Sequence, residues 1–146
     1  MLYSSSCEYA IRALSYLERS NERGLIPLAN IAETQSIPAP FLGKILQTLV
    51  KADLLRSVRG PTGGYALAQP ASEIRLLRIR EILDGNADLE RCAVGLDLCE
   101  DGTPCPLHET FRPIREAIKQ YLSETSLQDV AQGLRDKEAA IAARRT

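Results

Sequence analysis

The chain has 146 residues, of which 45% are hydrophobic, and a formal net charge of −1. This length fits one domain, or a small domain with an extension, and the apolar content is enough for a packed core. Because no apolar run approaches the roughly 20 residues of a membrane span, and the N-terminus lacks a signal-peptide core, we expect no membrane contact and a cytoplasmic location with reduced thiols.

Charge is divided unevenly along the chain. Residues 1–80 carry ten Lys and Arg against six Asp and Glu, which leaves +4, whereas residues 81–146 carry eight against thirteen, which leaves −5. The basic half is suited to a polyanion, and the acidic half would stay away from it.

The N-terminal part predicts three helices. The first should begin near Ser5 or Ser6, where Ser5–Glu8 has the S-x-x-E form of a capping box. A short helix over 26–33 follows, and after a turn a further helix begins around Pro38–Pro40 with an apolar stripe. Two helices joined by a short turn, the second amphipathic, form a helix-turn-helix pattern.

A predicted β-hairpin follows, with strands over 54–58 and 65–68 and a glycine-rich loop over 59–64. A hairpin placed after a helix-turn-helix is a wing, although a hairpin that only completes the core is the alternative. The helix 39–51 would then enter the major groove, Arg59 the minor groove, and the wing glycines would allow close approach. The candidate DNA contacts are Lys44, Gln47, Thr48, Lys51, Arg56, Arg59, Gly60, Thr62, Gly63 and Gly64.

Beyond a helix predicted over 74–83 lies a loop that contains Cys92, Cys99, Cys105 and the only histidine, His108. Six, five and two residues separate these four donors, which does not match the short knuckles of structural zinc sites. Iron–sulfur ligation, zinc binding, and thiols that oxidise or pair therefore all remain open, with iron–sulfur favoured. A helix starting at Pro106 would place Cys105 at its N-terminus and His108 on the same face.

The helix from Pro106 has an apolar stripe typical of a dimer seam, formed by Phe111, Ile114, Ile118, Tyr121 and Leu122. Ser126 can cap a final helix. The fold class is therefore mainly α with a small β-hairpin: a winged helix-turn-helix domain plus a long dimerisation helix. The expected division is a DNA-binding domain over 1–83, a cysteine-rich loop over 84–108, the dimerisation and final helices over 106–135, and a frayed tail over 136–146.

Tyr9-Ala10, Leu54-Leu55, the wing segment Ser57–Leu67 and the three-cysteine loop together resemble the Rrf-two family of bacterial winged-helix transcriptional regulators, over about residues 1–135. The resemblance implies a homodimer on a palindromic DNA operator, with an iron–sulfur cluster in the cysteine loop. One branch of the family uses a histidine placed like His108 as fourth ligand of a 2Fe–2S cluster. Another uses an acidic residue of the first helix, where Glu8 stands, for a 4Fe–4S cluster.

We favour His108 over Glu8 because its geometry is local and needs no second chain. Two positions depart from the family pattern: the loop between Cys92 and Cys99 is one residue longer, and Gly43 stands where a base-discriminating glutamate is found. Operator preference therefore does not transfer.

The sequence thus predicts a DNA-binding transcriptional regulator whose operator affinity depends on an iron–sulfur cluster and responds to redox state, iron, iron–sulfur status or nitric oxide. Two alternatives remain: a metal-binding or redox protein without DNA binding, and a cluster-free regulator of the same fold that uses thiol oxidation. With one histidine, no nucleophile–base motif and no nucleotide loop, we expect neither catalysis nor a small-molecule substrate.

Overall fold

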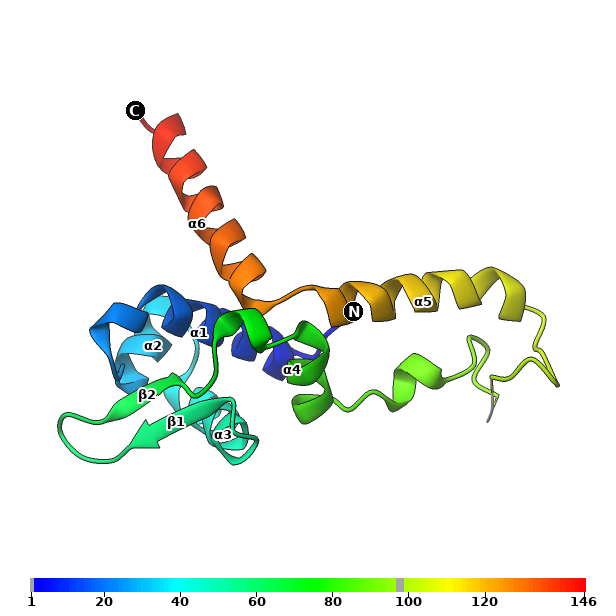
Figure 1. Ribbon diagram of the computed structural model, residues 1–146, viewed down its shortest axis with the longest axis horizontal. Coiled ribbons are helices and arrows are strands. Elements are labelled where there is room, and N and C mark those ends of the chain that lie inside the picture. Colours follow the sequence, from blue (N-terminus) through cyan, green and yellow to red (C-terminus); the bar gives the residue numbers. More distant parts are fainter. Residues whose placement is uncertain (1, 97–98) are drawn as a thin grey trace.

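Helices dominate the fold, and one β-hairpin lies between the third and fourth of the long helices (Figure 1). The computed structural model describes residues 2–96 and 99–146. In chain order the elements are α1 (Ser5–Arg19), η1 (Asn21–Arg23), α2 (Leu28–Gln35), α3 (Ala39–Lys51), β1 (Leu55–Val58), β2 (Gly64–Leu67), η2 (Ala71–Glu73), α4 (Leu76–Leu83), η3 (Ala87–Glu90), α5 (His108–Glu124) and α6 (Leu127–Arg144).

The cap of α1 differs from the predicted one. Ser4 is the N-cap, and its hydroxyl accepts a hydrogen bond from the Cys7 N–H at 3.1 Å. The predicted box with Glu8 is wrong, because capping from Ser4 puts Cys7, not Glu8, at the third helical position. Asp84, after α4, instead accepts from the Ser4 N–H at 2.9 Å and so takes the role of the box acid.

The core of the N-terminal half lies among α1, α2, α3 and α4. Its largest members are completely buried aliphatic side chains, and all four helices contribute them. Burial of each such side chain stabilises the fold by about 1.5–3 kcal/mol. The α2–α3 turn passes through Ser36 in the left-handed region, with φ of 53°, and returns the chain inward at Ile37. The core residues at 0% exposure include Leu14, Ile31, Leu42, Leu46, Leu49 and Ile79.

The hairpin pairs β1 with β2 in antiparallel register, from Leu55 opposite Leu67 to Val58 opposite Gly64. Ile26 adds a bridge on the other side of β2, because its N–H and carbonyl bond to the backbone of Tyr65 at 2.9 and 2.8 Å. The hairpin is therefore anchored to the segment that leads into α2, the first helix of the helix-turn-helix.

The fourth helix begins at Leu76, two residues later than predicted. Ile74 is extended, with φ of −89° and ψ of 110°, because its carbonyl accepts from the Leu127 N–H at 2.8 Å. The Leu76 N–H likewise donates to the Thr125 carbonyl at 3.1 Å. This short backbone pairing ties the winged domain to the junction between α5 and α6.

The last two helices extend away from the winged domain in different directions (Figure 1). The sequence predicts a frayed tail over 136–146, whereas the structure continues α6 to Arg144. Alanines at 139, 140, 142 and 143 favour helix strongly, and an Arg19–Glu138 ion pair holds the same stretch on α1. Within the described part of the chain, no helix combines the length and apolar character needed to cross a bilayer.

Candidate nucleic-acid interface and cysteine loop

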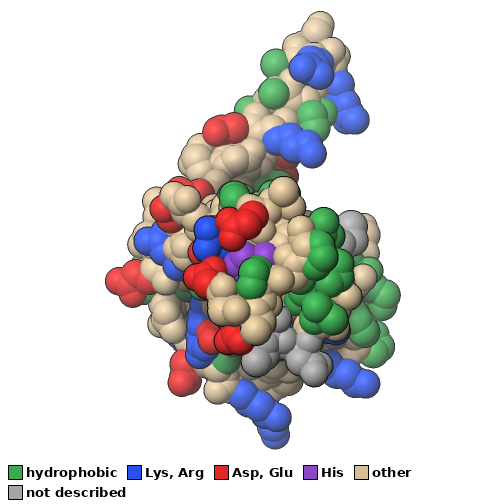
Figure 2. Space-filling view, turned by 90° about the vertical axis from the view of Figure 1, so that its right-hand side faces the viewer, with side chains coloured by type: hydrophobic (Ala, Val, Ile, Leu, Met, Phe, Trp, Pro, Cys, Tyr) green, Lys and Arg blue, Asp and Glu red, His purple; other side chains and the backbone are tan. Residues whose placement is uncertain are grey.

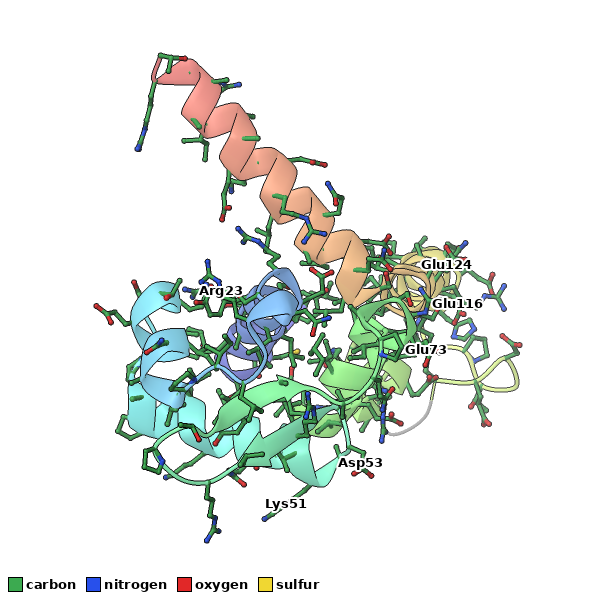
Figure 3. All side chains as sticks on the ribbon, turned by 60° about the vertical axis from the view of Figure 1, so that its left-hand side comes forward. Arg23, Lys51, Asp53, Glu73, Glu116 and Glu124 are labelled. Atoms are coloured by element: carbon green, nitrogen blue, oxygen red, sulfur yellow. The ribbon has the colours of Figure 1, made fainter. Side chains whose placement is uncertain are left out.

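One face of α3 is exposed and carries the four helical residues predicted to contact DNA. Lys44, Gln47, Thr48 and Lys51 follow the spacing that places side chains on one side of a helix, and all four are exposed. The opposite side of α3 is buried in the core. Lys51 points away from the body of the molecule in Figure 3, which is the orientation that a phosphate contact requires.

Two of these side chains also make contacts within the chain. The Gln47 amide donates to the Tyr65 hydroxyl at 2.9 Å, which ties α3 to β2. The Thr48 hydroxyl donates to the Lys44 carbonyl at 3.0 Å. Gln47 therefore fixes the angle between α3 and the wing, a role that the sequence pattern did not indicate.

The wing exposes its cations and buries one of its glycines, Gly63. Arg56 and Arg59 are exposed, as is Thr62, and Gly60 turns the chain with φ of 109°. Gly63 and Gly64 are required by the chain itself: a Cβ on Gly63 would lie 2.0 Å from the Val58 carbonyl oxygen, and one on Gly64 2.4 Å from the Ile26 backbone. The lack of a side chain at Gly63 thus allows the tight turn, and the lack of one at Gly64 allows the bridge to Ile26.

The charge of this surface is positive. Residues 39–64 contain two lysines and two arginines against the single acid Asp53. A groove of about 360 Å³ lies between the wing and the start of α2, and its lining includes Gln47 and Arg59. An exposed helix face beside a basic wing is the arrangement that reads DNA with the helix and holds its backbone with the wing.

At the other end of the molecule, the structure brings the four predicted donors together as two pairs. The Cys99 Sγ lies 3.2 Å from the Nδ1 of His108, and Cys92 and Cys105 lie near enough for each thiol to shift the pKa of the other. No three His, Cys, Asp or Glu side chains of the described residues surround a common point closely enough to hold one metal ion. All four cysteines are free thiols.

A hydrogen bond at its Nε2 orients the imidazole of His108. His108 is the first residue of α5 and is 4% exposed, and its Nε2 lies 2.9 Å from the Asp101 carboxylate. Arg112 pairs with the same carboxylate at 3.0 Å. The hydrogen bond from His108 lowers the pKa of Asp101 and keeps it ionised. Since Nε2 is hydrogen-bonded to Asp101, Nδ1 is the ring nitrogen that can coordinate a metal, and it faces the Cys99 sulfur.

The α5 helix begins at His108 rather than at Pro106, which corrects the predicted start. The Cys105 carbonyl accepts from the His108 N–H at 3.0 Å, so Cys105 precedes the helix as part of a turn. The helix continues through Pro113. Figure 2 shows this end of the molecule, where acidic side chains surround the histidine and an apolar patch lies beside it.

Backbone amides surround the Cys92 sulfur. Hydrogen bonds from the backbone of Val94, then Leu96 and Gly95, lower the pKa of Cys92, although burial opposes them. Interaction with the Cys92 thiol raises the pKa of Cys105. Cys92 is thus the thiol of this pair that forms a thiolate first, and thiolate is the form that binds metals.

The donor set fits an iron–sulfur cluster. Three thiols and one buried imidazole, with amide N–H groups directed at a sulfur, match the ligands and the hydrogen bonds that such clusters use. Glu8, the alternative ligand, is half-buried on the first turn of α1. Cys7, beside it, is completely buried, and burial raises its pKa to about 12, so it is a core residue outside the loop.

Sequence reasoning missed three residues that hold the loop. Arg80 is 4% exposed and donates to the carbonyls of Leu2 and Gly85, to Asn86 and to Asp88. Asp101 orients His108, and Arg115, 6% exposed, donates to the Cys99 sulfur at 3.0 Å. Arg115 lies seven residues after His108, a helical spacing that could have indicated it.

The exposed basic face of α3 and the adjoining wing define the class, in agreement with the names of its relatives: a DNA-binding winged helix-turn-helix transcriptional regulator. The family described as Rrf2, iron-dependent transcriptional regulator, matches residues 3–133. The chain belongs to this family.

Relatives and solved structures agree with this. The HTH-type transcriptional regulator IscR of Photorhabdus laumondii is 35% identical over 130 residues, which cover 89% of this chain and 79% of that protein. The structure of T. potens IscR has a TM-score of 0.70 at 28% identity and covers 94% of this chain and 88% of its own. That of CymR, the global cysteine regulator of B. subtilis, has a TM-score of 0.72 at 28% identity and covers 88% and 95%.

Proposed function

We propose that this regulator's operator affinity depends on an iron–sulfur cluster held by Cys92, Cys99, Cys105 and His108. The observation that carries the proposal is the buried imidazole of His108, whose Nδ1 lies against the Cys99 sulfur while Asp101 holds Nε2. The description of the family as iron-dependent agrees with it. When bound, such a cluster supplies a centre that can change oxidation state or be lost.

The fourth ligand decides the type of cluster. We favour His108 and a 2Fe–2S cluster, because imidazole and thiol are already in contact within one chain. Glu8 with a 4Fe–4S cluster is the alternative, and it would require a carboxylate from α1 of a second subunit. Substitution of His108 by alanine separates the two, since only the first cluster would lose a ligand.

Two attachments would transmit the state of the loop. At its start, Arg80 holds the segment after α4 through Asn86 and Asp88. At the end of the loop, His108 is itself the first residue of α5. A rearrangement of the four ligands would therefore shift α5 relative to the winged domain, and a bias of about 1.4 kcal/mol between two arrangements changes DNA occupancy about tenfold.

The proposed second subunit would pack on α5. The predicted stripe divides in the structure: Leu122 is buried in the core, whereas Ile114 and Tyr121 are 55% and 48% exposed. Together with Leu107 they recur every seven residues, which forms an exposed apolar seam. A two-fold dimer built on this seam would present two α3 helices to a palindromic operator.

On DNA, we propose that α3 enters the major groove and that the wing contacts the flanking backbone. Lys44 and Thr48 would reach base edges or phosphates, Lys51 and Arg56 phosphates, and Arg59 the minor groove. The turn at Gly60 places Arg59 at the exposed tip that such a contact needs.

The test compares Cys92→Ala with wild type, both purified without oxygen. Wild type should show visible absorbance and bound iron, and its operator affinity should change at least tenfold when the cluster is removed. Cys92→Ala should lack the absorbance and bind with the affinity of the cluster-free form. The matched control is Cys7→Ala, which removes a thiol outside the loop. Equal affinity of cluster-loaded and cluster-free wild type would refute the proposal, and bound zinc without iron would replace it.

A second candidate is control by thiol oxidation without a cluster. The Cys92 and Cys105 thiols are near neighbours, since each shifts the pKa of the other. Moreover, the oxidized form of Staphylococcus aureus CymR is a structural neighbour, with a TM-score of 0.71 at 28% identity. Peroxide would take two electrons and two protons from this pair and leave a disulfide and water. Mass spectrometry of peroxide-treated, metal-free protein should then find Cys92 joined to Cys105.

A further inference from the structure

Arg115 is buried against the candidate ligands although its side chain is charged. Its exposed fraction is 6%, and its Nη2 donates to the Cys99 sulfur at 3.0 Å. Among the described residues, no carboxylate lies within ion-pair distance of its guanidinium. Arginine is rarely buried without a partner, so a partner is expected on this face of α5.

The side chain is fixed in place by its own helix. His108, Phe111 and Arg115 lie three and four residues apart and therefore share one face of α5. The guanidinium lies over the ring of Phe111, 5.5 Å from its centroid, and this stacking orients the planar group. Arg115 and His108 thus both reach the Cys99 sulfur from the same helix.

The Cys99 sulfur consequently has two defined neighbours, the His108 Nδ1 at 3.2 Å and the Arg115 Nη2 at 3.0 Å. Resting on the proposed function, we propose that Arg115 is a positioning residue. It holds the Cys99 sulfur beside His108, and by donating a hydrogen bond to that sulfur in the cluster-bound protein it stabilises the more reduced cluster. A hydrogen bond or a positive charge at a ligating sulfur favours the electron-rich state, and hydrogen bonds to sulfur are one of the determinants of cluster potential.

The experiment uses Arg115→Met and Arg115→Lys in the full chain, with Arg78→Met as the matched control. Arg78 is half-exposed on α4 and pairs with Glu81 at 2.8 Å, so its loss removes an arginine without touching the cysteine loop. The first measurement is the midpoint potential of the reconstituted cluster. Arg115→Met should shift the ratio of oxidised to reduced cluster about tenfold toward oxidised at a fixed potential, which is about 59 mV for one electron. Arg115→Lys should shift it less, and the control should not shift it.

The second measurement is independent of any cluster. The chain has one histidine, so the ring nitrogen resonances of metal-free protein report on His108 alone. Arg115→Met should move or broaden the Nδ1 resonance, because the sulfur is no longer held against it, whereas the control should leave it unchanged. Thermal melting confirms folding of each variant, and Arg115→Lys replaces Arg115→Met if the latter does not fold.

The two hypotheses fail in different ways. If wild type binds a cluster, and the Arg115 variants change neither its midpoint potential nor the His108 ring resonances, the proposed role of Arg115 is refuted. The proposed cluster is not affected by that result. A wild type that binds no cluster would refute the proposed function. In that case the ring resonances alone decide whether Arg115 positions Cys99, and unchanged resonances refute it.

Discussion

The winged domain and the cysteine loop are held together by different forces. In the winged domain, completely buried aliphatic side chains from four helices pack on one another. The loop is held instead by single polar contacts, which join Arg80 to Asp88, Asp101 to His108, and Arg115 to Cys99. Dispersion and hydrophobic burial are spread over many atoms, whereas each polar contact depends on one donor and one acceptor. We therefore expect a single substitution to disturb the loop contacts while the DNA-binding domain stays folded.

The largest expected effect comes from a paired truncation that tests this contrast. Leu46→Ala in the core should lower the free energy of unfolding by about 2–5 kcal/mol, because it leaves a cavity among fixed neighbours. Leu96→Ala, at a loop position that is 56% exposed, should change it by less than about 0.5 kcal/mol. Urea denaturation of both variants measures the difference. Similar losses in the two would show that the loop is packed like the core.

A second test asks whether the wing serves DNA binding alone. Arg59→Ala should leave thermal stability unchanged, since the side chain is exposed and makes no ion pair among the described residues. Its operator affinity should fall, and the slope of log affinity against log salt should become shallower by about one unit. Fluorescence anisotropy with labelled operator at several salt concentrations checks this. Glu73→Ala, an exposed acid outside the wing, is the control; an unaltered slope for Arg59→Ala would mean that the wing does not contact the backbone.

The smallest expected effect concerns pH and the Arg80 contact at the start of the loop. The hydrogen bond from Arg80 lowers the pKa of Asp88, so the carboxylate stabilises the folded state above its unfolded pKa of about 4, and this stabilisation is lost as the pH falls through the lower folded value. Asp88→Asn should thus melt slightly below wild type at pH 7, and the gap should close in acid as the pH falls through the lowered pKa of Asp88. Asp88 is largely exposed, so the difference is small. A gap that persisted in acid would exclude an electrostatic origin.

The same contrast explains which parts of the structure could be predicted from the sequence. The helix-turn-helix and the hairpin were predicted nearly to the residue, because period-3.6 stripes and a glycine loop report burial and turns directly. The exceptions are positions where distant segments meet. Ile74 was predicted helical but pairs its backbone with Leu127, and the α1 cap uses Asp84, eighty residues away from Ser4.

In the cysteine loop the sequence indicated which residues bear the chemistry but not how they pair. Spacing could not show that Cys92 meets Cys105 and that Cys99 meets His108, since an irregular loop has no repeat from which to infer contacts. The supporting residues Arg80, Asp101 and Arg115 were missed for the same reason. A charged residue looks like solvated surface until the fold buries it.

The register of α5 has an evolutionary consequence. His108 and Arg115 meet at Cys99 only because seven residues of helix return a side chain to the same face. One residue inserted between them would turn the rest of the helix by about 100° and carry Arg115 away from the sulfur. In descendants of this protein, insertions and deletions in the first two turns of α5 should therefore be selected against.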